Sequence, residues 1–389
     1  MGNLKKRLAN FIDQRKCTIL GVGPMSLNCV DVTIDLANSY DIPILLISSR
    51  RQIDSKDFGG GYVNNWTTDE FAKYVVKKDI KKNIYLSRDH GGPWQNEQEL
   101  KNNLSLKDAM ESAKKSYLED IKSGYKVLHI DPSIDVNSKP TIDQVLERIF
   151  ELYEFCCESA QKFKKEIIFE IGTEEQSSTT NSSEELEYTL NKVNEFCDSS
   201  NFTKPTFVVV QTGTKVLETR NIGSFESAIR IKNEIPASIQ LPILLKLFKK
   251  YDYFMKAHNC DYLSSSGINW HPRLGIHAAN VAPEFGVCET RSLINLLETN
   301  NLKKIADQFL DLSYKSKKWE KWLIPNSQIS DREKSIIAGH YSFSSQEGID
   351  LRKKAEKSLS AKDIDMNKVI KQDLKKSICR YILNFRMIR

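Results

Sequence analysis

Histidine and carboxylate side chains recur at the ends of short apolar stretches between residues 83 and 282. Imidazole and carboxylate groups together suit a borderline divalent metal such as zinc, and carboxylates can also transfer protons. If the apolar stretches are strands whose ends meet, these side chains share one site. In chain order they are Asp89, His90, His129, Asp131, Glu170, Glu174, Glu175, Gln211, Thr212, His258, Asn259, Asp261, His277 and Asn280.

Each of these residues also has a structural explanation. A single histidine at the end of a strand is more often a hydrogen-bonded structural residue than a metal ligand. Asp89 and His90 could cap the helix that follows them, and Asp131 precedes a proline, as turn residues often do. Glu174 and Glu175 could be solvated loop charges. Only the occurrence of so many such residues at the same end of successive strands favours a metal site.

The apolar stretches indicate the fold. Each begins as a nearly continuous apolar, β-branched run, which is typical of a strand buried on both faces. Most are separated by segments with helical spacing of apolar residues. Eight strands that alternate with helices predict an α/β fold, a (β/α)₈ TIM barrel, whose usual size is ~250 residues. The eight stretches are residues 17–23, 42–49, 83–90, 126–133, 166–172, 206–213, 253–260 and 274–282.

An open, doubly wound sheet is the alternative fold. Its dinucleotide-binding fingerprint is absent, because the stretch after the first strand lacks the third glycine and has Pro24 where a helix should begin. The link over residues 261–273 is short, so the crossover helix there is expected to be reduced or replaced by a loop. In a barrel, the polar residues at the strand ends lie on the catalytic face.

A loop after the second strand, DFGGGYVNNWT, contains the consecutive glycines Gly59, Gly60 and Gly61. Glycine-rich loops can offer backbone N–H groups to a phosphate. A tight turn explains the same three residues equally well. The sequence alone leaves both interpretations open.

Composition limits the function classes. With 40% hydrophobic and 28% charged residues, the chain can bury a sizeable core. No apolar run approaches the ~20 residues that span a membrane, and no nucleic-acid-binding motif is present. The N-terminus lacks the apolar segment of a signal peptide, and the eight cysteines form no CxxC pair. We therefore expect a cytoplasmic protein that binds neither membrane nor nucleic acid, with buried free thiols.

The positive charge of the chain is concentrated near its end. Residues 350–389 hold twelve Lys and Arg against five Asp and Glu, whereas the whole chain has a net charge of only +6. We expect a barrel domain over residues 1–330 and a C-terminal helical extension over residues 331–389. A solvated helix face is the default explanation of the charge. Docking to a partner subunit, or closure over an anionic substrate, is the alternative.

The sequence resembles the class II aldolase superfamily. It is most similar to the tagatose-bisphosphate aldolase accessory-subunit family, which includes ketose-phosphate 4-epimerase-like members. The resemblance covers roughly residues 17–330 and agrees with a (β/α)₈ barrel. The matching stretches, in the family's order, are FGGGYVNNWTTDEF, RDHGGPW, GYKVLHIDPS, EIGTEE, VVQTGT, AHNCDY and NVAPEFG.

The resemblance implies roles for individual residues. His90 and His258 match metal-binding histidines, and Asp89 matches the adjacent catalytic acid/base. Glu170 resembles a carboxylate that can approach the metal. The remaining expected roles are catalytic for Glu174 and Glu175, and substrate-binding for Gly59, Gly60, Gly61, Asp131, Gln211, His277 and Asn280.

One departure from the family pattern leaves two hypotheses open. Catalytic members have a further metal histidine after strand six, where this chain reads QTGTKVLE; Gln211, Glu218 or His277 are the alternatives for its place. The first hypothesis is an enzyme that uses a divalent metal, zinc by preference, for retro-aldol chemistry on a ketose phosphate, as an aldolase or a C4 epimerase. The second is a non-catalytic subunit that stabilises a separate aldolase chain. The chain is expected to form a homo-oligomer or to bind that partner subunit.

Overall fold

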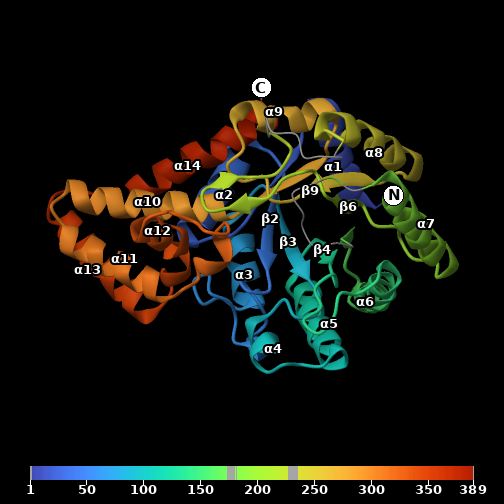
Figure 1. The fold of residues 1–389 in the computed structure, drawn as a ribbon, viewed down its shortest axis with the longest axis horizontal. Helices are drawn as coiled ribbons and strands as arrows, with labels where there is room; N and C mark the ends of the chain where they lie inside the picture. Colours follow the sequence, from blue (N-terminus) through green and yellow to red (C-terminus); the bar gives the residue numbers. More distant parts are fainter. Residues whose placement is uncertain (1, 173–179, 181, 227–234, 389) are drawn as a thin grey trace.

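The computed structural model describes residues 2–172, 180, 182–226 and 235–388 of the chain. Eight parallel strands close into a barrel in the order β1-β10-β9-β6-β5-β4-β3-β2, and helices surround it (Figure 1). The prediction of an α/β TIM barrel is confirmed, and each barrel strand lies within or overlaps one predicted stretch. The strands are β1 (Ile19–Val22), β2 (Ile44–Ser49), β3 (Ile84–Gly91), β4 (Val127–Ile130), β5 (Ile168–Ile171), β6 (Phe207–Val210), β9 (Phe254–Ala257) and β10 (Ala278–Val281).

The helices begin where side chains can satisfy their first N–H groups. Thr67 and Thr141 each form a capping box with the residue three positions later, which fixes the start of α3 (Thr68–Lys78) and of α6 (Ile142–Lys162). A short antiparallel pair, β7 (Val216–Leu217) and β8 (Arg220–Asn221), follows β6. The helices around the barrel are α2 (Leu27–Tyr40), α3 (Thr68–Lys78), α4 (Glu97–Lys101), α5 (Leu106–Ser123), α6 (Ile142–Lys162), α7 (Ser183–Ser199), α8 (Ala237–Tyr251), α9 (Ser265–Leu274) and α10 (Pro283–Thr299), with a 3₁₀ turn η1 (Lys56–Phe58).

The short crossover between β9 and β10 contains a helix. It is α9, which has 10 residues, and the Ser264 side chain accepts a hydrogen bond from the Gly267 N–H at its start. The expectation of a reduced helix is therefore confirmed, and the alternative of a loop is wrong.

The interior of the barrel changes character along the strands. Alternate residues of each strand point inward. At the N-terminal end these side chains are apolar and form one cluster, which helix α1 (Asn3–Arg15) closes with the fully buried Leu8. At the next inward-pointing position of the strands, two residues toward their carboxyl ends, polar side chains begin to replace the apolar ones. The apolar layer comprises Ile19, Leu45, Ile47, Tyr85, Val127, Ile168, Phe207 and Ala278, and the buried polar residues above it include Ser87, His129, Glu170, Lys256 and Asn280.

The chain ends in a helical region, as predicted. Helices α11 (Lys303–Lys315), α12 (Asp331–Ser342) and α13 (Gln346–Ser360), with a 3₁₀ turn η2 (Glu320–Trp322), gather beside the barrel, whereas α14 (Met366–Asn384) runs along α2, α9 and α10 (Figure 1). Helix α11 precedes residue 331 yet packs against α12 and α13. The exact division into residues 1–330 and 331–389 stays a prediction.

Two expectations about the chain as a whole can be compared with the structure. None of the described helices has both the length and the apolar character that a membrane span requires. All eight cysteines are free thiols, and six of them are buried.

Candidate metal and active site

Three histidines from different strands converge at the carboxyl ends of the barrel strands. They are His90 on β3, His129 on β4 and His258 directly after β9. Each offers a ring nitrogen, and these three atoms lie within 4.8 Å of one another. The ring centroids are 5.0 to 5.3 Å apart, so the imidazoles surround a common point. Three imidazoles are a ligand set that catalytic zinc sites use.

The sequence pattern does not predict the third histidine of this cluster, His129, as a ligand, although His129 lies at a strand end. Its alternatives for the missing position are Gln211, Glu218 and His277. The structure places the Glu218 carboxylate elsewhere, where it accepts a hydrogen bond from the Ser327 hydroxyl at 2.6 Å. Gln211 is buried just after β6.

His277 lies at the other end of the barrel. Its ring stacks on Phe254, the first residue of β9, and its Nδ1 accepts a hydrogen bond from the Met255 N–H at 3.0 Å. The structure therefore does not bring His277 to the cluster, neither as a ligand nor beside a substrate bound there. The predicted stretch 274–282 runs from one end of the barrel to the other, and His277 stands before the strand begins.

His90 is oriented by the carboxylate of Asp131. Its Nδ1 lies 2.6 Å from Asp131 Oδ2, and Asp131 Oδ1 accepts a hydrogen bond from the Ser133 hydroxyl at 2.5 Å. Enclosure at the barrel mouth disfavours a charged ring, but Asp89 and Asp131 outweigh this and raise the pKa of His90 to about 9. Asp131 thus holds one ring nitrogen of His90 and leaves Nε2 directed elsewhere. This is the arrangement in which a second partner fixes the orientation of a metal-binding histidine.

His129 and His258 are buried and electrically neutral at neutral pH. Burial lowers the pKa of each to about 3. His129 Nε2 and His258 Nδ1 are buried and have no hydrogen-bond partner among the described residues. Unsatisfied buried nitrogens are rare and costly, and neutral imidazole is the form that binds metals. These residues therefore fit a divalent metal such as zinc.

Gly172, just after β5, leaves space beside the His129 ring. A Cβ at this position would lie 2.7 Å from His129 Nε2, so any side chain would crowd the unpartnered nitrogen. The other nitrogen of the same ring, Nδ1, accepts a hydrogen bond from the His90 N–H at 3.2 Å. In this tautomer the neutral ring carries its proton on Nε2, so Nε2 could bind a metal only after the proton moves to Nδ1 and the hydrogen bond from His90 is broken.

A buried ion pair lies directly beside the histidines. Glu170 on β5 and Lys256 on β9 are 0% and 1% exposed, and their Oε2 and Nζ atoms are 2.5 Å apart. The second oxygen of Glu170 lies 3.1 Å from His258 Nε2 and 3.7 Å from His129 Nδ1. Glu170 is therefore next to the cluster, as expected, but both of its oxygens already have protein partners. Lys256, a lysine in the middle of an apolar stretch, is not among the site residues predicted from the sequence.

Asp89 and Asn280 complete the cluster. The Asn280 amide donates a hydrogen bond to Asp89 Oδ1 at 3.1 Å and lies 3.1 Å from His258 Nε2. Asn280 Oδ1 is buried without a partner among the described residues. Gly21 on β1 makes this possible, because a Cβ there would lie 2.3 Å from that oxygen. A carboxylate held in place beside three imidazoles can accept a proton from a bound molecule.

The three glycines of the predicted phosphate loop form a tight turn. The N–H groups of Gly59, Gly60 and Gly61 donate to the carbonyls of Lys56, Ser55 and Trp66 at 3.0, 3.1 and 3.1 Å. They are therefore not free to bind a phosphate, which favours the second of the two interpretations. A Cβ on Gly61 would lie 2.0 Å from the Gln52 carbonyl oxygen, which explains a glycine there.

The predicted catalytic residues Glu174 and Glu175 lie outside the described residues.

Comparison with known proteins decides the family. Residues 4–222 match the family described as D-tagatose-1,6-bisphosphate aldolase subunit GatZ/KbaZ-like, and this is more than half of the chain. The chain belongs to this family. The matched region includes His90, His129 and Glu170 of the cluster, whereas His258 and Asn280 lie beyond it. No curated protein sequence matches the chain.

Solved structures share the fold of this GatZ/KbaZ-like chain. A probable tagatose 6 phosphate kinase from Sinorhizobium meliloti 1021 has a TM-score of 0.72 at 16% identity, covering 94% of this chain and 100% of that one. Fructose-bisphosphate aldolase from Campylobacter jejuni has a TM-score of 0.57 at 11% identity, covering 99% and 94%. Fructuronate-tagaturonate epimerase UxaE from Cohnella laeviribosi has a TM-score of 0.55 at 12% identity, covering 94% and 81%. At these identities the likeness concerns the fold.

Proposed function

We propose that this chain is an enzyme that uses a divalent metal, zinc by preference, to break and form a C–C bond beside the ketone of a sugar phosphate. The observation that carries the proposal is the convergence of His90, His129 and His258, two of them with unpartnered buried nitrogens, beside Asp89. The GatZ/KbaZ-like family supports a tagatose-bisphosphate type of substrate. Aldolase and epimerase appear among the names of proteins with this fold.

The residues of the cluster have distinct roles in this chemistry. His90, His129 and His258 would hold the metal, which polarises the ketone oxygen of the substrate when bound. Asp89 accepts the proton of the hydroxyl on the far side of the bond that breaks, and the bond's electrons pass to the carbon beside the ketone. The products are an aldehyde and an enediolate. The Asn280 amide holds Asp89 in place for this transfer.

Two outcomes are possible after the bond breaks. If both fragments leave, the reaction is that of an aldolase. If the aldehyde turns and is attacked on its other face, the sugar is returned with inverted C4. Both outcomes need the same side chains, because Asp89 returns its proton to the new hydroxyl in the second case.

A second candidate function is supported by the description of the family as an aldolase subunit. In that case the chain stabilises a separate catalytic aldolase and has no turnover of its own. The assay that separates the two candidates is incubation of the purified chain with ketose mono- and bisphosphates and divalent metals. If the chain by itself forms triose products or C4 epimers, the enzyme hypothesis is supported. If the chain by itself has no turnover but stimulates an added aldolase chain, the subunit hypothesis is supported.

Metal analysis tests the ligand set itself. We expect about one zinc or similar ion per chain in the wild type, and loss of that ion in His129→Ala. The matched control is His277→Ala, because this half-buried histidine lies at the opposite end of the barrel. It should keep both the metal and the activity. A wild-type chain without stoichiometric divalent metal, active or not, would rule out the proposed metal centre.

A further inference from the structure

The ion pair between Lys256 and Glu170 stands inside the barrel, where the neighbouring layer is apolar. Lys256 on β9 lies two residues before His258, which directly follows this strand, so both side chains point inward. Its ammonium approaches Glu170 Oε2 at 2.5 Å and lies 5.9 Å from the centre of the Phe207 ring in the apolar layer. The pair therefore separates the apolar half of the interior from the three histidines.

Stability alone does not explain such a pair. Replacing a buried ion pair by well-packed apolar side chains is often neutral or stabilising. The barrel shows that apolar residues can fill its interior, because they do so one layer below. We therefore look for the reason for Lys256 and Glu170 in the histidines that they adjoin.

Glu170 would otherwise be suited to bind a metal. Carboxylate oxygens are zinc ligands, and Glu170 is within hydrogen-bond distance of one imidazole of the cluster. A fourth protein ligand would close the coordination sphere, which is typical of structural zinc sites, whereas catalytic sites keep a position open. In this structure one carboxylate oxygen is bound by Lys256 and the other lies against His258 Nε2.

We propose that Lys256 is a positioning residue that keeps Glu170 out of the metal's coordination sphere. By neutralising the carboxylate and binding one of its oxygens, Lys256 makes Glu170 a hydrogen-bond acceptor for Nε2 of His258. Nδ1 of His258, which has no partner among the described residues, is then the nitrogen left for the metal. The three imidazoles would hold the ion and leave a position open for a substrate oxygen. This inference rests on the proposed function, since it concerns the metal that the histidines would hold.

Cobalt(II) is the probe for this inference, because its visible absorption reports the ligands around it. Wild-type chain freed of metal is titrated with Co²⁺ beside Lys256→Met, which keeps the length of the side chain and removes its charge. We expect Glu170 to enter the coordination sphere of the variant. The absorption band should shift, and the Kd for Co²⁺ should fall by about tenfold, the size of effect typical of groups beside metal ligands.

A double variant separates this effect from a general disturbance. Lys256→Met/Glu170→Gln removes both charges and leaves an amide oxygen that can still accept from His258, so the wild-type Co²⁺ spectrum should return. This variant also tests the inference if Lys256→Met alone does not fold. Arg148→Met is the matched control, because Arg148 on α6 is also an enclosed cation and is paired with Asp135 at 2.7 Å, away from the histidines. It should lower stability without changing the spectrum.

The possible failures can be told apart. If the folded Lys256→Met variant has the spectrum of the wild type, Lys256 does not control Glu170 and the inference is wrong. A folded double variant whose spectrum differs from the wild type contradicts it as well, because Lys256 then acts on the site by another route. If the wild type itself binds no Co²⁺, the proposed metal enzyme fails and the inference falls with it.

Discussion

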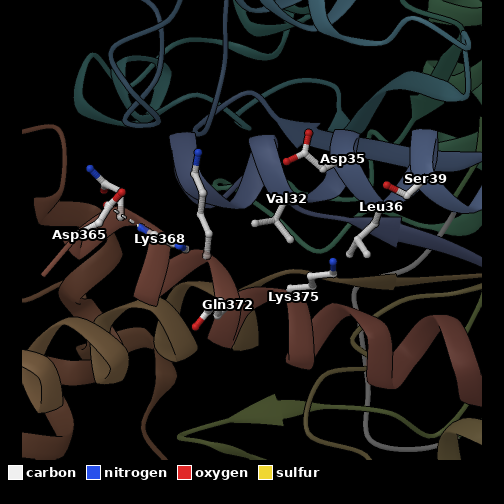
Figure 2. Close-up of a pocket in the computed structure, with 10 residues that line it drawn as sticks. Val32, Asp35, Leu36, Ser39, Asp365, Lys368, Gln372 and Lys375 are labelled. Carbon is white, nitrogen blue, oxygen red and sulfur yellow. Dashed lines mark hydrogen bonds between the residues drawn. The ribbon is translucent and has the colours of Figure 1, made fainter.

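The barrel mouth and a groove between α2 and α14 both gather charged side chains, but in different surroundings. The groove has a volume of about 340 Å³, and Figure 2 shows Val32 and Leu36 of α2 facing α14 with Lys368 and Lys375 beside them. Asp35, Lys368 and Lys375 are exposed there. At the mouth, by contrast, His129, His258 and Glu170 are buried and lie against one another.

The difference shows why only one of the two clusters is a candidate site. Exposed charges are solvated by water and need no partner, so a group of them has little energetic consequence. Buried polar atoms need partners, and those left without one mark a place where something else is expected to bind. Unpartnered ring nitrogens occur at the mouth, whereas the lysines of the groove are free to remain in water.

The largest expected effect is the loss of catalysis in Asp89→Asn. The amide cannot accept a proton, so kcat/KM should fall by about 10²–10⁴, the usual contribution of a general base. Steady-state kinetics on a ketose phosphate that the wild-type chain turns over would measure this. Metal content and unfolding midpoint should stay close to wild type, since the asparagine has nearly the same shape.

The matched control for this variant lies in the groove. Asp35→Asn makes the same chemical change at an exposed aspartate on α2. It should leave kcat/KM and stability unchanged within error. Equal losses in the two variants would contradict the distinction between the clusters.

A smaller effect is expected for Asp31→Asn, where the barrel and α14 are joined beside the groove. Asp31 is 7% exposed and accepts hydrogen bonds from Tyr74, Lys78 and Lys371 at 2.5 to 2.6 Å. Loss of hydrogen bonds to a charged group should lower the free energy of unfolding by about 1.5–3 kcal/mol. Activity per folded molecule should not change. Urea denaturation and kinetics on the same preparation would separate the two quantities.

The strands of the barrel could be predicted from the sequence because all of them are buried on both faces. Each strand is therefore a nearly continuous apolar stretch, and polar residues toward its carboxyl end are conspicuous. Asp89, His90, His258 and Asn280 stand out in this way, and the resemblance to class II aldolases supplies their expected roles.

His129 and Lys256 were harder to assign. His129 lies inside β4, and Lys256 inside β9, where a polar residue interrupts an apolar pattern. The alternation of side chains along a strand could have placed them, since residues two positions apart point to the same side. It places Lys256 with His258, whereas His277 and Asn280, an odd number of residues apart, point to opposite sides. Which strands bring their side chains together is a property of the closed barrel and not of any one stretch.

The pH dependence of stability offers a finer test at Asp31. Burial opposes its charged form, but hydrogen bonds from Lys371 and Lys78 outweigh this, so the pKa of Asp31 lies below its ordinary value of 3.8. A carboxyl group with a lowered pKa stabilises the fold above the unfolded-state pKa, and this contribution is lost as the pH falls through the folded-state pKa. Wild type and Asp31→Asn should therefore differ fully near pH 7 and converge below about pH 3.8. Urea midpoints across this range would measure it, and a difference that persists in acid would show that packing and not charge is responsible.

The smallest effect is expected where a lysine is removed from the groove. Lys375 is exposed, and the described part of the structure gives its ammonium no ion pair, so Lys375→Ala should change the free energy of unfolding by no more than about 0.5 kcal/mol. Lys256→Met removes the same charge from the barrel interior and leaves Glu170 buried without its cation, which should cost about 3–5 kcal/mol. Chemical denaturation of both variants compares one residue type in two environments. If the two losses were similar, burial would not distinguish the clusters, and the mouth would have no stronger claim to be the site than the groove.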